Sequence, residues 1–150
     1  MEVRLLEKGE GLPMKLLLEA DTSEKLVNDY CGRGSVYRAT IDGELIGVYV
    51  LLPLSVETVE IKNIAVAESA RGQGYGKKLI FHALAEAERL GFGKVEIGTG
   101  NSSFGQLALY QKCGFRIDSV DRDFFTRNYP EPIMENGIPC KDMIRLLYTL

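Results

Sequence analysis

Apolar residues along this chain follow two spacings, one typical of strands and one typical of helices. Runs that alternate in part, or that are dense in Val and Ile, predict strands at residues 2–7, 58–66, 94–100 and 115–120. Between residues 35 and 54, two β-rich runs are joined by Asp42-Gly43, which is a strong hairpin signal. Asn136-Gly137 is a second hairpin signal, between residues 131–134 and a last strand at 140–150.

Two helices are expected before the first hairpin. Leucines recur at helical spacing over residues 12–20, and a second helix is expected over residues 23–31. Asp21 or Thr22 lies near the cap of the second helix, and Gly32 is expected to stop it.

The clearest helix follows the strand at 58–66 and a glycine-rich stretch. Its apolar stripe has a period of about 3.6 residues and consists of Leu79, Ile80, Ala83, Leu84, Ala87 and Leu90. His82 lies off this stripe and is expected at the surface. A further short helix is expected to start at Ser103 and Gln106, which have capping-box spacing, and to end at Gly114.

These elements follow one another in an order that mixes meander and crossover connections. The order predicts an α+β fold with a single mixed sheet and helices on its faces. A length of 150 residues suits one domain, and no repeat, low-complexity tract or linker divides it. We therefore expect one domain over residues 1–150.

Composition narrows the classes of function. The net charge is −3 and no stripe of Lys and Arg appears, which argues against a nucleic-acid partner. No apolar run approaches the roughly 20 residues that span a bilayer, so no membrane partner is expected, and the charged N-terminus does not resemble a signal peptide. Three dispersed cysteines and one histidine offer no metal pattern. A reducing, cytoplasmic location is the simplest interpretation.

Three glycines alternate with other residues between the strand at 58–66 and the clearest helix. Gly72, Gly74 and Gly76 would let a ligand approach the main chain at a helix N-terminus, where backbone N–H groups lack partners. A tight turn that needs positive φ is the simpler alternative. The basic residues around the glycines favour phosphate binding. The stretch is neither a P-loop nor a Rossmann dinucleotide motif, because its spacing and context differ from both.

The stretch NIAVAESARGQGYGKKL resembles motif A of the GNAT superfamily, the acetyl-CoA-dependent N-acetyltransferases. Arg71, Gly74 and Gly76 match its characteristic positions. The later LALYQKCGF is similar to motif B, with Tyr110 and the Gly114-Phe115 pair in place. The order of elements also matches, so the resemblance covers nearly the whole chain.

The resemblance implies a GNAT-like fold in which two central parallel strands, at about residues 58–67 and 94–98, splay apart. Acetyl-CoA would lie in the gap, with its pantetheine along the first strand and its pyrophosphate on the glycine-rich loop. The expected cofactor-binding residues are Ile64, Ala65, Val66, Arg71, Gly72, Gln73, Gly74, Tyr75, Gly76 and Lys77. Asn101 would bond the pantetheine as in many relatives, but the link to Tyr110 is longer than usual, so Ser103 is an alternative.

The implied reaction is acetyl transfer from a thioester to an amine. An alkyl amine with a pKa of about 10.4 must lose a proton before it attacks, and a carboxylate can take that proton. Two strand glutamates are candidates: Glu96, placed as in the ribosomal-protein alanine N-acetyltransferases that the strand resembles, and Glu60 on the neighbouring strand. A water chain with no dedicated base is the alternative to both. Tyr110 is the candidate acid for the leaving thiolate, with packing as the alternative.

The acceptor stays open between a small-molecule amine and a protein amine. The tail after residue 123 either shapes an acceptor pocket, as in the family, or forms a packing or homodimer contact. The alternative to an enzyme is a coenzyme A-binding sensor or interaction domain that turns over little.

Overall fold

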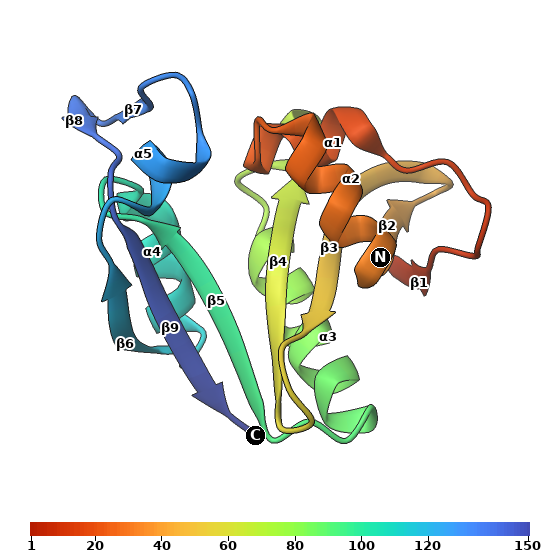
Figure 1. Cartoon of the computed structure of the whole chain (residues 1–150). Helices are drawn as coiled ribbons and strands as arrows, with labels where there is room; N and C mark the ends of the chain where they lie inside the picture. Colours follow the sequence, from red (N-terminus) through yellow and green to blue (C-terminus); the bar gives the residue numbers. More distant parts are fainter.

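The computed structural model describes residues 1–150 and has one central seven-stranded sheet in the order β1-β2-β3-β4-β5-β9-β6 (Figure 1). The strands are β1 (Glu2–Leu5), β2 (Ser35–Ile41), β3 (Glu44–Pro53), β4 (Thr58–Val66), β5 (Lys94–Gly100), β6 (Arg116–Asp121) and β9 (Met143–Thr149). Only the β4–β5 pair is parallel, and every other pair in the sheet is antiparallel. This confirms the expected α+β fold with a central mixed sheet, which is mostly antiparallel.

The parallel pair separates partway along its length. Thr58 to Ile61 of β4 pair with Lys94 to Ile97 of β5, and the pairing then stops. Opposite β3, the register of β4 shifts around Lys62, which is the local bend expected of a β-bulge. Beyond this point β4 stays with β3 and β5 stays with β9, so the two halves of the sheet diverge (Figure 1).

The helices cover both faces of the sheet. The elements are α1 (Met14–Ala20), α2 (Glu24–Arg33), η1 (Glu68–Ala70), α3 (Tyr75–Arg89), α4 (Phe104–Lys112) and α5 (Phe124–Asn128). One buried cluster lies under α3 and α4 and includes Tyr49, Ile61 and Leu79; the other lies under α1 and α2 and includes Leu17 and Val50. Each cluster takes alternate residues of the central strands, as the pleat requires. No helix combines the length and apolarity needed to span a bilayer.

Several local predictions were wrong. Gly32 lies inside α2, which is capped by the Ser23 hydroxyl and runs to Arg33. Ser103 precedes α4, but its side chain makes no capping hydrogen bond. Leu90 exposes 47% of its surface because it lies at the end of α3, outside the contact with the sheet.

Two further differences concern long-range contacts. His82 is half-buried rather than at the surface, because its Nδ1 lies 2.7 Å from the hydroxyl of the buried Tyr49. The Asn136-Gly137 turn joins two short strands, β7 (Met134–Glu135) and β8 (Ile138–Pro139), which form a separate hairpin. The last strand of the main sheet, β9, starts only at Met143.

Candidate active site

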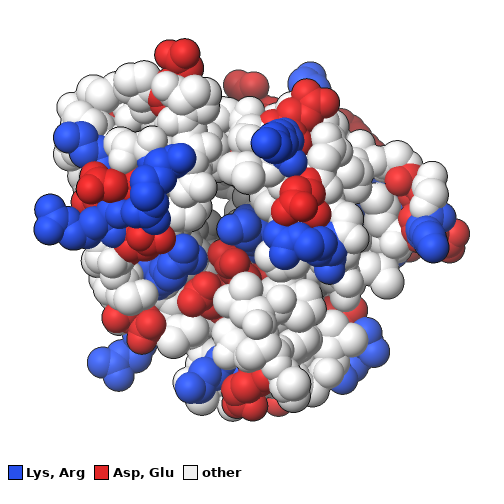
Figure 2. Space-filling view, viewed as in Figure 1, with Lys and Arg blue, Asp and Glu red and all other residues white.

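A cavity of about 260 Å³ opens where β4 and β5 separate. Its walls come from β4, β5, α4, α5 and the loop between α1 and α2. Figure 2, viewed as in Figure 1, shows a hollow near the middle of the molecule, with charged side chains of both signs around it. The gap in the sheet therefore contains a cavity that residues from both halves of the chain line.

The glycine-rich loop forms the approach to the N-terminus of α3. Gly72 and Gly74 have φ values of 76° and 83°, in the left-handed region, and a Cβ at either would meet no other atom within 4 Å. Gly76 differs, because it lies in the first turn of α3 with ordinary φ. Positive φ is thus required at two of the three glycines, and open space lies in front of both.

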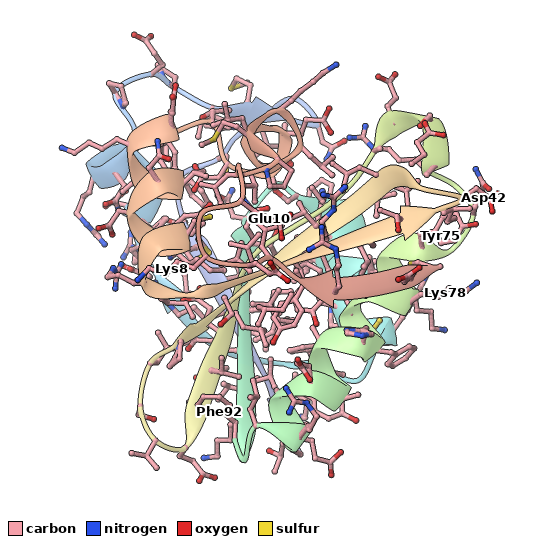
Figure 3. All side chains as sticks on the ribbon, turned by 90° about the vertical axis from the view of Figure 1, so that its right-hand side faces the viewer. Lys8, Glu10, Asp42, Tyr75, Lys78 and Phe92 are labelled. Atoms are coloured by element: carbon pink, nitrogen blue, oxygen red, sulfur yellow. The ribbon has the colours of Figure 1, made fainter.

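The backbone amides of residues 72–77 donate no hydrogen bond within the protein. The amide of Arg71 donates to Glu68, and the next amide along the chain that donates is that of Lys78, to Gly74. Lys77 and Lys78 are exposed beside them in the first turn of α3. Figure 3 shows Tyr75 and Lys78 at this end of α3, with Phe92 beyond the other end. Free N–H groups, a helix N-terminus and two ammonium groups together suit an anionic phosphate group.

The side chain of Arg71 makes hydrogen bonds within the protein, unlike those of the exposed Lys77 and Lys78. Its Nε donates to the Val66 carbonyl at 3.0 Å, and its guanidinium pairs with Glu19 at 2.9 Å. The side chain therefore ties the end of β4 to α1. Its amide donates to Glu68 at 3.3 Å, so the structure uses both ends of Arg71 to shape the loop.

The edge of β4 that faces the gap is unpaired after Ile61. The Ala67 amide donates to Ile46 of β3, so with a period of two residues the amide of Ala65 also points to β3. The amides of Ile64 and Val66 point the other way, toward the gap. An extended ligand with amide groups could therefore accept hydrogen bonds from the Ile64 and Val66 amides in the gap. The amide of Ala65 is directed to β3 and is not available to such a ligand.

Tyr110 reaches the cavity from α4, on the α3 and α4 face of the sheet. It is 5% exposed, and burial raises the pKa of its phenol well above the ordinary value. The hydroxyl is therefore protonated at neutral pH and is available as a donor.

Glu60 and Glu96 are paired across β4 and β5 and lie on the opposite face from Tyr110. Glu60 lines the cavity and exposes 5% of its surface, and burial raises the pKa of its carboxyl. Lys62 lies 3.8 Å away and lowers that pKa in part. Glu96 is not on the cavity wall and pairs with Arg145 at 3.6 Å.

Asn101 and Ser103 have different surroundings. The amide oxygen of Asn101 accepts from Lys141 and Asp142, and its nitrogen donates to Pro139 at 3.1 Å. Both polar atoms thus hold the segment that leads into β9. Ser103 lines the cavity with a hydroxyl that makes no capping bond.

Sequence reasoning missed two polar residues of the cavity, Asp21 and Asn63. Asp21 accepts hydrogen bonds from Tyr30 at 3.0 Å and from Tyr129 at 2.7 Å. Asn63 donates to the Tyr30 hydroxyl at 2.9 Å. No local sequence pattern predicts this hydrogen-bonded cluster, because its residues come from the α1–α2 loop, α2, β4 and the end of α5.

The aromatic residues of the tail also reach the cavity. Phe124, Phe125 and Tyr129 line it, and Phe125 packs against both other rings with centroids 5.1 and 5.8 Å apart. The tail therefore forms part of the cavity wall.

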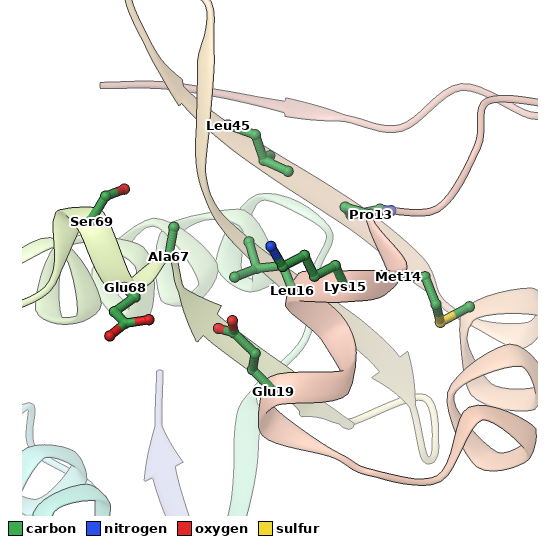
Figure 4. Close-up of a pocket in the computed structure, with 9 residues that line it drawn as sticks. All are labelled: Pro13, Met14, Lys15, Leu16, Glu19, Leu45, Ala67, Glu68 and Ser69. Atoms are coloured by element: carbon green, nitrogen blue, oxygen red, sulfur yellow. The ribbon is translucent and has the colours of Figure 1, made fainter.

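A second depression, of about 670 Å³, lies between α1 and the segment after β4 (Figure 4). It is outside the gap between β4 and β5. Its walls include Met14, Leu45 and Ala67, and only Glu19 is shared with the cavity between the strands. Neither candidate glutamate nor Tyr110 reaches it, so we place the site in the smaller cavity.

Comparisons with known proteins agree with this geometry. The chain matches the Acetyltransferase (GNAT) family over residues 10–115. It is 56% identical to the uncharacterized N-acetyltransferase YvbK of Bacillus subtilis (strain 168), over 100% of this chain and 97% of that protein.

Among solved structures, a GNAT family acetyltransferase from Elizabethkingia anophelis with acetyl-CoA bound has a TM-score of 0.98 and 49% identity, over 99% of this chain and 97% of that chain. An IAA acetyltransferase from Bacillus cereus ATCC 14579 has a TM-score of 0.95 and 54% identity, over 99% of both chains.

The expected resemblance to ribosomal-protein alanine N-acetyltransferases is found in sequence and in fold. The chain is 24% identical to the ribosomal protein bS18-alanine N-acetyltransferase of Escherichia coli (strain K12) over 89 residues, which are 59% of this chain and 60% of that protein. The ribosomal-protein-S18-alanine N-acetyltransferase from Escherichia coli has a TM-score of 0.79 at 22% identity, over 99% of this chain and 92% of that chain. The family match covers most of the chain, and the identity to YvbK extends over its full length. This protein belongs to the GNAT acetyltransferase family.

Proposed function

We propose that this protein transfers the acetyl group of acetyl-CoA to a small primary amine, by direct attack of the amine in a ternary complex. One observation carries the proposal: a buried carboxyl, Glu60, and a protonated phenol, Tyr110, reach the same cavity from opposite faces of the separated strands. A base and an acid on either side of one reaction centre are what acetyl transfer from a thioester to an amine requires.

Acetyl-CoA is the acetyl donor used by this family, and close structural relatives hold acetyl-CoA or coenzyme A. The residues present fit it. The free amides of residues 72–77 and the lysines beside them suit the pyrophosphate, and the amides of Ile64 and Val66 suit the pantetheine. Ser103, which faces the cavity, is better placed than Asn101 for a further pantetheine contact.

Glu60 is the proposed general base, directly or through a water molecule. Its pKa is raised by burial, which makes the carboxylate a better proton acceptor than an exposed glutamate. Glu96 is held by Arg145 and lies off the cavity wall, so we assign it an electrostatic role beside Glu60.

The transfer itself forms a bond from the amine nitrogen to the acetyl carbon and breaks the carbon–sulfur bond. An amide N–H of the open β4 edge is positioned to stabilise the oxyanion that develops on the acetyl oxygen. Glu60 takes the proton that the ammonium form of the acceptor loses before attack, and Tyr110 donates its proton to the departing sulfur. The second proton of the nitrogen leaves after attack and restores the Tyr110 phenol.

The cavity must hold both the thioester end of acetyl-CoA and the acceptor, so its size favours a small acceptor. Ligand pockets commonly measure roughly 300–1,000 Å³, and this cavity is about 260 Å³. A coenzyme A-binding sensor would keep the glycine loop but would have no use for a base and an acid at one cavity, so the geometry favours turnover.

The test is titration calorimetry with acetyl-CoA, with ATP and NAD as controls, followed by thiol release with a panel of amines. Micromolar binding of acetyl-CoA alone and amine-dependent release of coenzyme A would support the proposal. Binding without release for any amine would favour the sensor, and folded protein that does not bind acetyl-CoA would overturn the proposal.

A further inference from the structure

The end of the cavity next to the α1–α2 loop has a polar cluster that the proposed acetyl transfer does not use. The cluster consists of Asp21, Tyr30, Asn63 and Tyr129, and three of these four residues lie on the cavity wall. Tyr129 comes from the end of α5, so its bond to Asp21 joins the two halves of the molecule across the gap.

Asp21 is a half-buried carboxylate without a cation. Three neutral groups donate to it: the Ser23 amide at 3.1 Å and the hydroxyls of Tyr30 and Tyr129. No Lys or Arg forms an ion pair with it, whereas Glu19 and Glu60, two further carboxylates on the cavity wall, each have a basic partner. Its negative charge is therefore oriented by the protein but not neutralised by it.

Asn63 adds a second, independent observation. It is 4% exposed, and its Nδ2 donates to the Leu17 carbonyl at 3.0 Å and to the Tyr30 hydroxyl. Because a carbonyl can only accept, this contact fixes the orientation of the amide. Its Oδ1 is buried and has no partner, which is costly for a polar atom in a folded protein.

Asp21 lacks a counter-charge and the Oδ1 of Asn63 lacks a hydrogen-bond partner, so a positively charged donor would complete both. An ammonium group supplies three N–H donors and a positive charge to the carboxylate. Two aromatic rings on the same wall, those of Phe125 and Tyr129, suit a cation as well. The Phe124 ring, in contrast, already has the Arg145 guanidinium 5.6 Å from its centre. Lys62 does not fill this role, because its ammonium pairs with Glu60 and lies 5.8 Å from the centre of the Tyr30 ring.

We propose that Asp21 and Asn63 form a subsite for a second protonated nitrogen of the acceptor, so that the preferred acceptors are small diamines. The inference rests on the proposed function for the placement of the reacting amine near Glu60. The second nitrogen would lie at the other end of the cavity, with Tyr129 and Tyr30 holding the carboxylate that receives it.

The experiment measures binding of linear diamines of four to eight carbons, and of monoamines of the same lengths, to the protein saturated with coenzyme A. Titration calorimetry reports binding whether or not turnover occurs. We expect the best diamine to bind at least about tenfold more tightly than its matched monoamine, as hydrogen bonds to charged groups imply. Equal affinities would overturn the inference.

Asp21→Asn keeps the shape of the side chain and removes its charge. We expect it to abolish the preference for diamines, with unchanged acetyl-CoA affinity and a change of less than about threefold in monoamine affinity. Asp29→Asn is the matched control, because Asp29 is exposed on α2 and pairs only with Arg33. A diamine preference that survives in Asp21→Asn would also overturn the inference.

The two proposals fail in different ways. If acetyl-CoA does not bind, the proposed function is wrong, and the same titrations of diamines and monoamines on the protein alone still test the subsite. If acetyl-CoA binds and all amines are acetylated equally well, only the subsite is wrong. If Asp21→Asn does not fold, the comparison of diamines with monoamines on the unaltered protein decides the question.

Discussion

Glu60 of β4 and Glu96 of β5 are direct partners across the parallel pair and face the same side of the sheet. Their surroundings differ, since Glu60 is buried on the cavity wall while Glu96 is held by Arg145. Burial, together with the neighbouring Glu96, raises the pKa of Glu60. The strand geometry thus places two like charges together but gives only one of them access to the cavity.

This difference predicts opposite outcomes for two conservative changes. Glu60→Gln removes the proposed base and should lower kcat by about a hundredfold or more, which is the usual size of a general-base contribution. Glu96→Gln is the matched control on the neighbouring strand and should lower kcat far less. Steady-state kinetics with a saturating amine measure both, and a larger loss in Glu96→Gln would reverse the assignment.

The pH dependence of the unaltered enzyme should follow Glu60. A protonated carboxyl cannot take a proton, so kcat should fall as the pH falls through the raised pKa of Glu60. The acidic limb should lie above the pH at which an exposed glutamate titrates. A kcat profile that shows no limb above that range would contradict this role.

Stability should change in the direction opposite to activity. Because the folded state raises the pKa of Glu60, its contribution to stability is present below the unfolded pKa and is lost as the pH rises through the folded pKa. Glu60→Gln should therefore keep or raise the melting temperature at neutral pH, while it lowers kcat. Thermal unfolding of the two proteins measures this, and a marked loss of stability would make Glu60 a structural residue.

Tyr110 and Tyr49 offer a similar contrast. The Tyr110 hydroxyl has no hydrogen-bond partner among the protein's own side chains, whereas that of Tyr49 bonds the Nδ1 of His82. Tyr110→Phe should lower kcat at least about tenfold with little change in acetyl-CoA affinity or stability. Tyr49→Phe should cost about 1 kcal/mol in the free energy of unfolding and leave kcat unchanged.

Kinetics, calorimetry and thermal unfolding of both variants separate the two roles. If Tyr110→Phe retained full kcat, the tyrosine would belong to the packing under α4 rather than to the chemistry.

Local signals predicted the scaffold and the loop well. The apolar stripe from Leu79 to Ala87 and the alternating glycines lie within single elements, so spacing alone shows a buried helix face and an exposed backbone. The Asp42-Gly43 turn was also predicted correctly, because the conformation of such a turn depends on its own two residues.

The parts that were missed depend on contacts far apart in the chain. Arg145 distinguishes Glu96 from Glu60, yet it lies on β9. The Asp21–Tyr129 bond joins residues 108 positions apart. No spacing rule reaches that far, so the polar end of the cavity appears only when the fold brings these segments together.

The glycine loop gives a further prediction with a control on the same helix. Gly74 and Gly91 flank opposite ends of α3, both have positive φ, and a Cβ at either meets nothing within 4 Å. Replacement by Asp strains the backbone similarly at both. Only Gly74→Asp places a carboxylate beside the free amides at the N-terminus of α3. The C-terminal end of the helix, where Gly91 lies, is about 22 Å away.

We expect Gly74→Asp to weaken acetyl-CoA binding by at least about tenfold, and Gly91→Asp to bind as the unaltered protein does. Calorimetric titration of both folded variants measures this. Equal affinities would remove the loop from the binding site.

The last prediction concerns two glycines at the end of α2 that differ in what surrounds them. Gly32 lies within the helix, and a Cβ there meets nothing within 4 Å. Gly34 follows the helix, and a Cβ there would lie 2.5 Å from the Leu51 carbonyl oxygen and 3.1 Å from that of Tyr30. Gly32→Ala should raise the free energy of unfolding by about 0.5–1 kcal/mol, because alanine loses less entropy in a helix.

Gly34→Ala should lower the free energy of unfolding by about 1–3 kcal/mol, because the clash is with backbone that must shift. Denaturant unfolding of the two variants measures both changes. The same residue replacement is thus expected to have opposite signs at positions two residues apart. Destabilisation by Gly32→Ala would mean that the helix does not continue to Arg33, while tolerance of Gly34→Ala would mean that α2 does not pack so closely on β3.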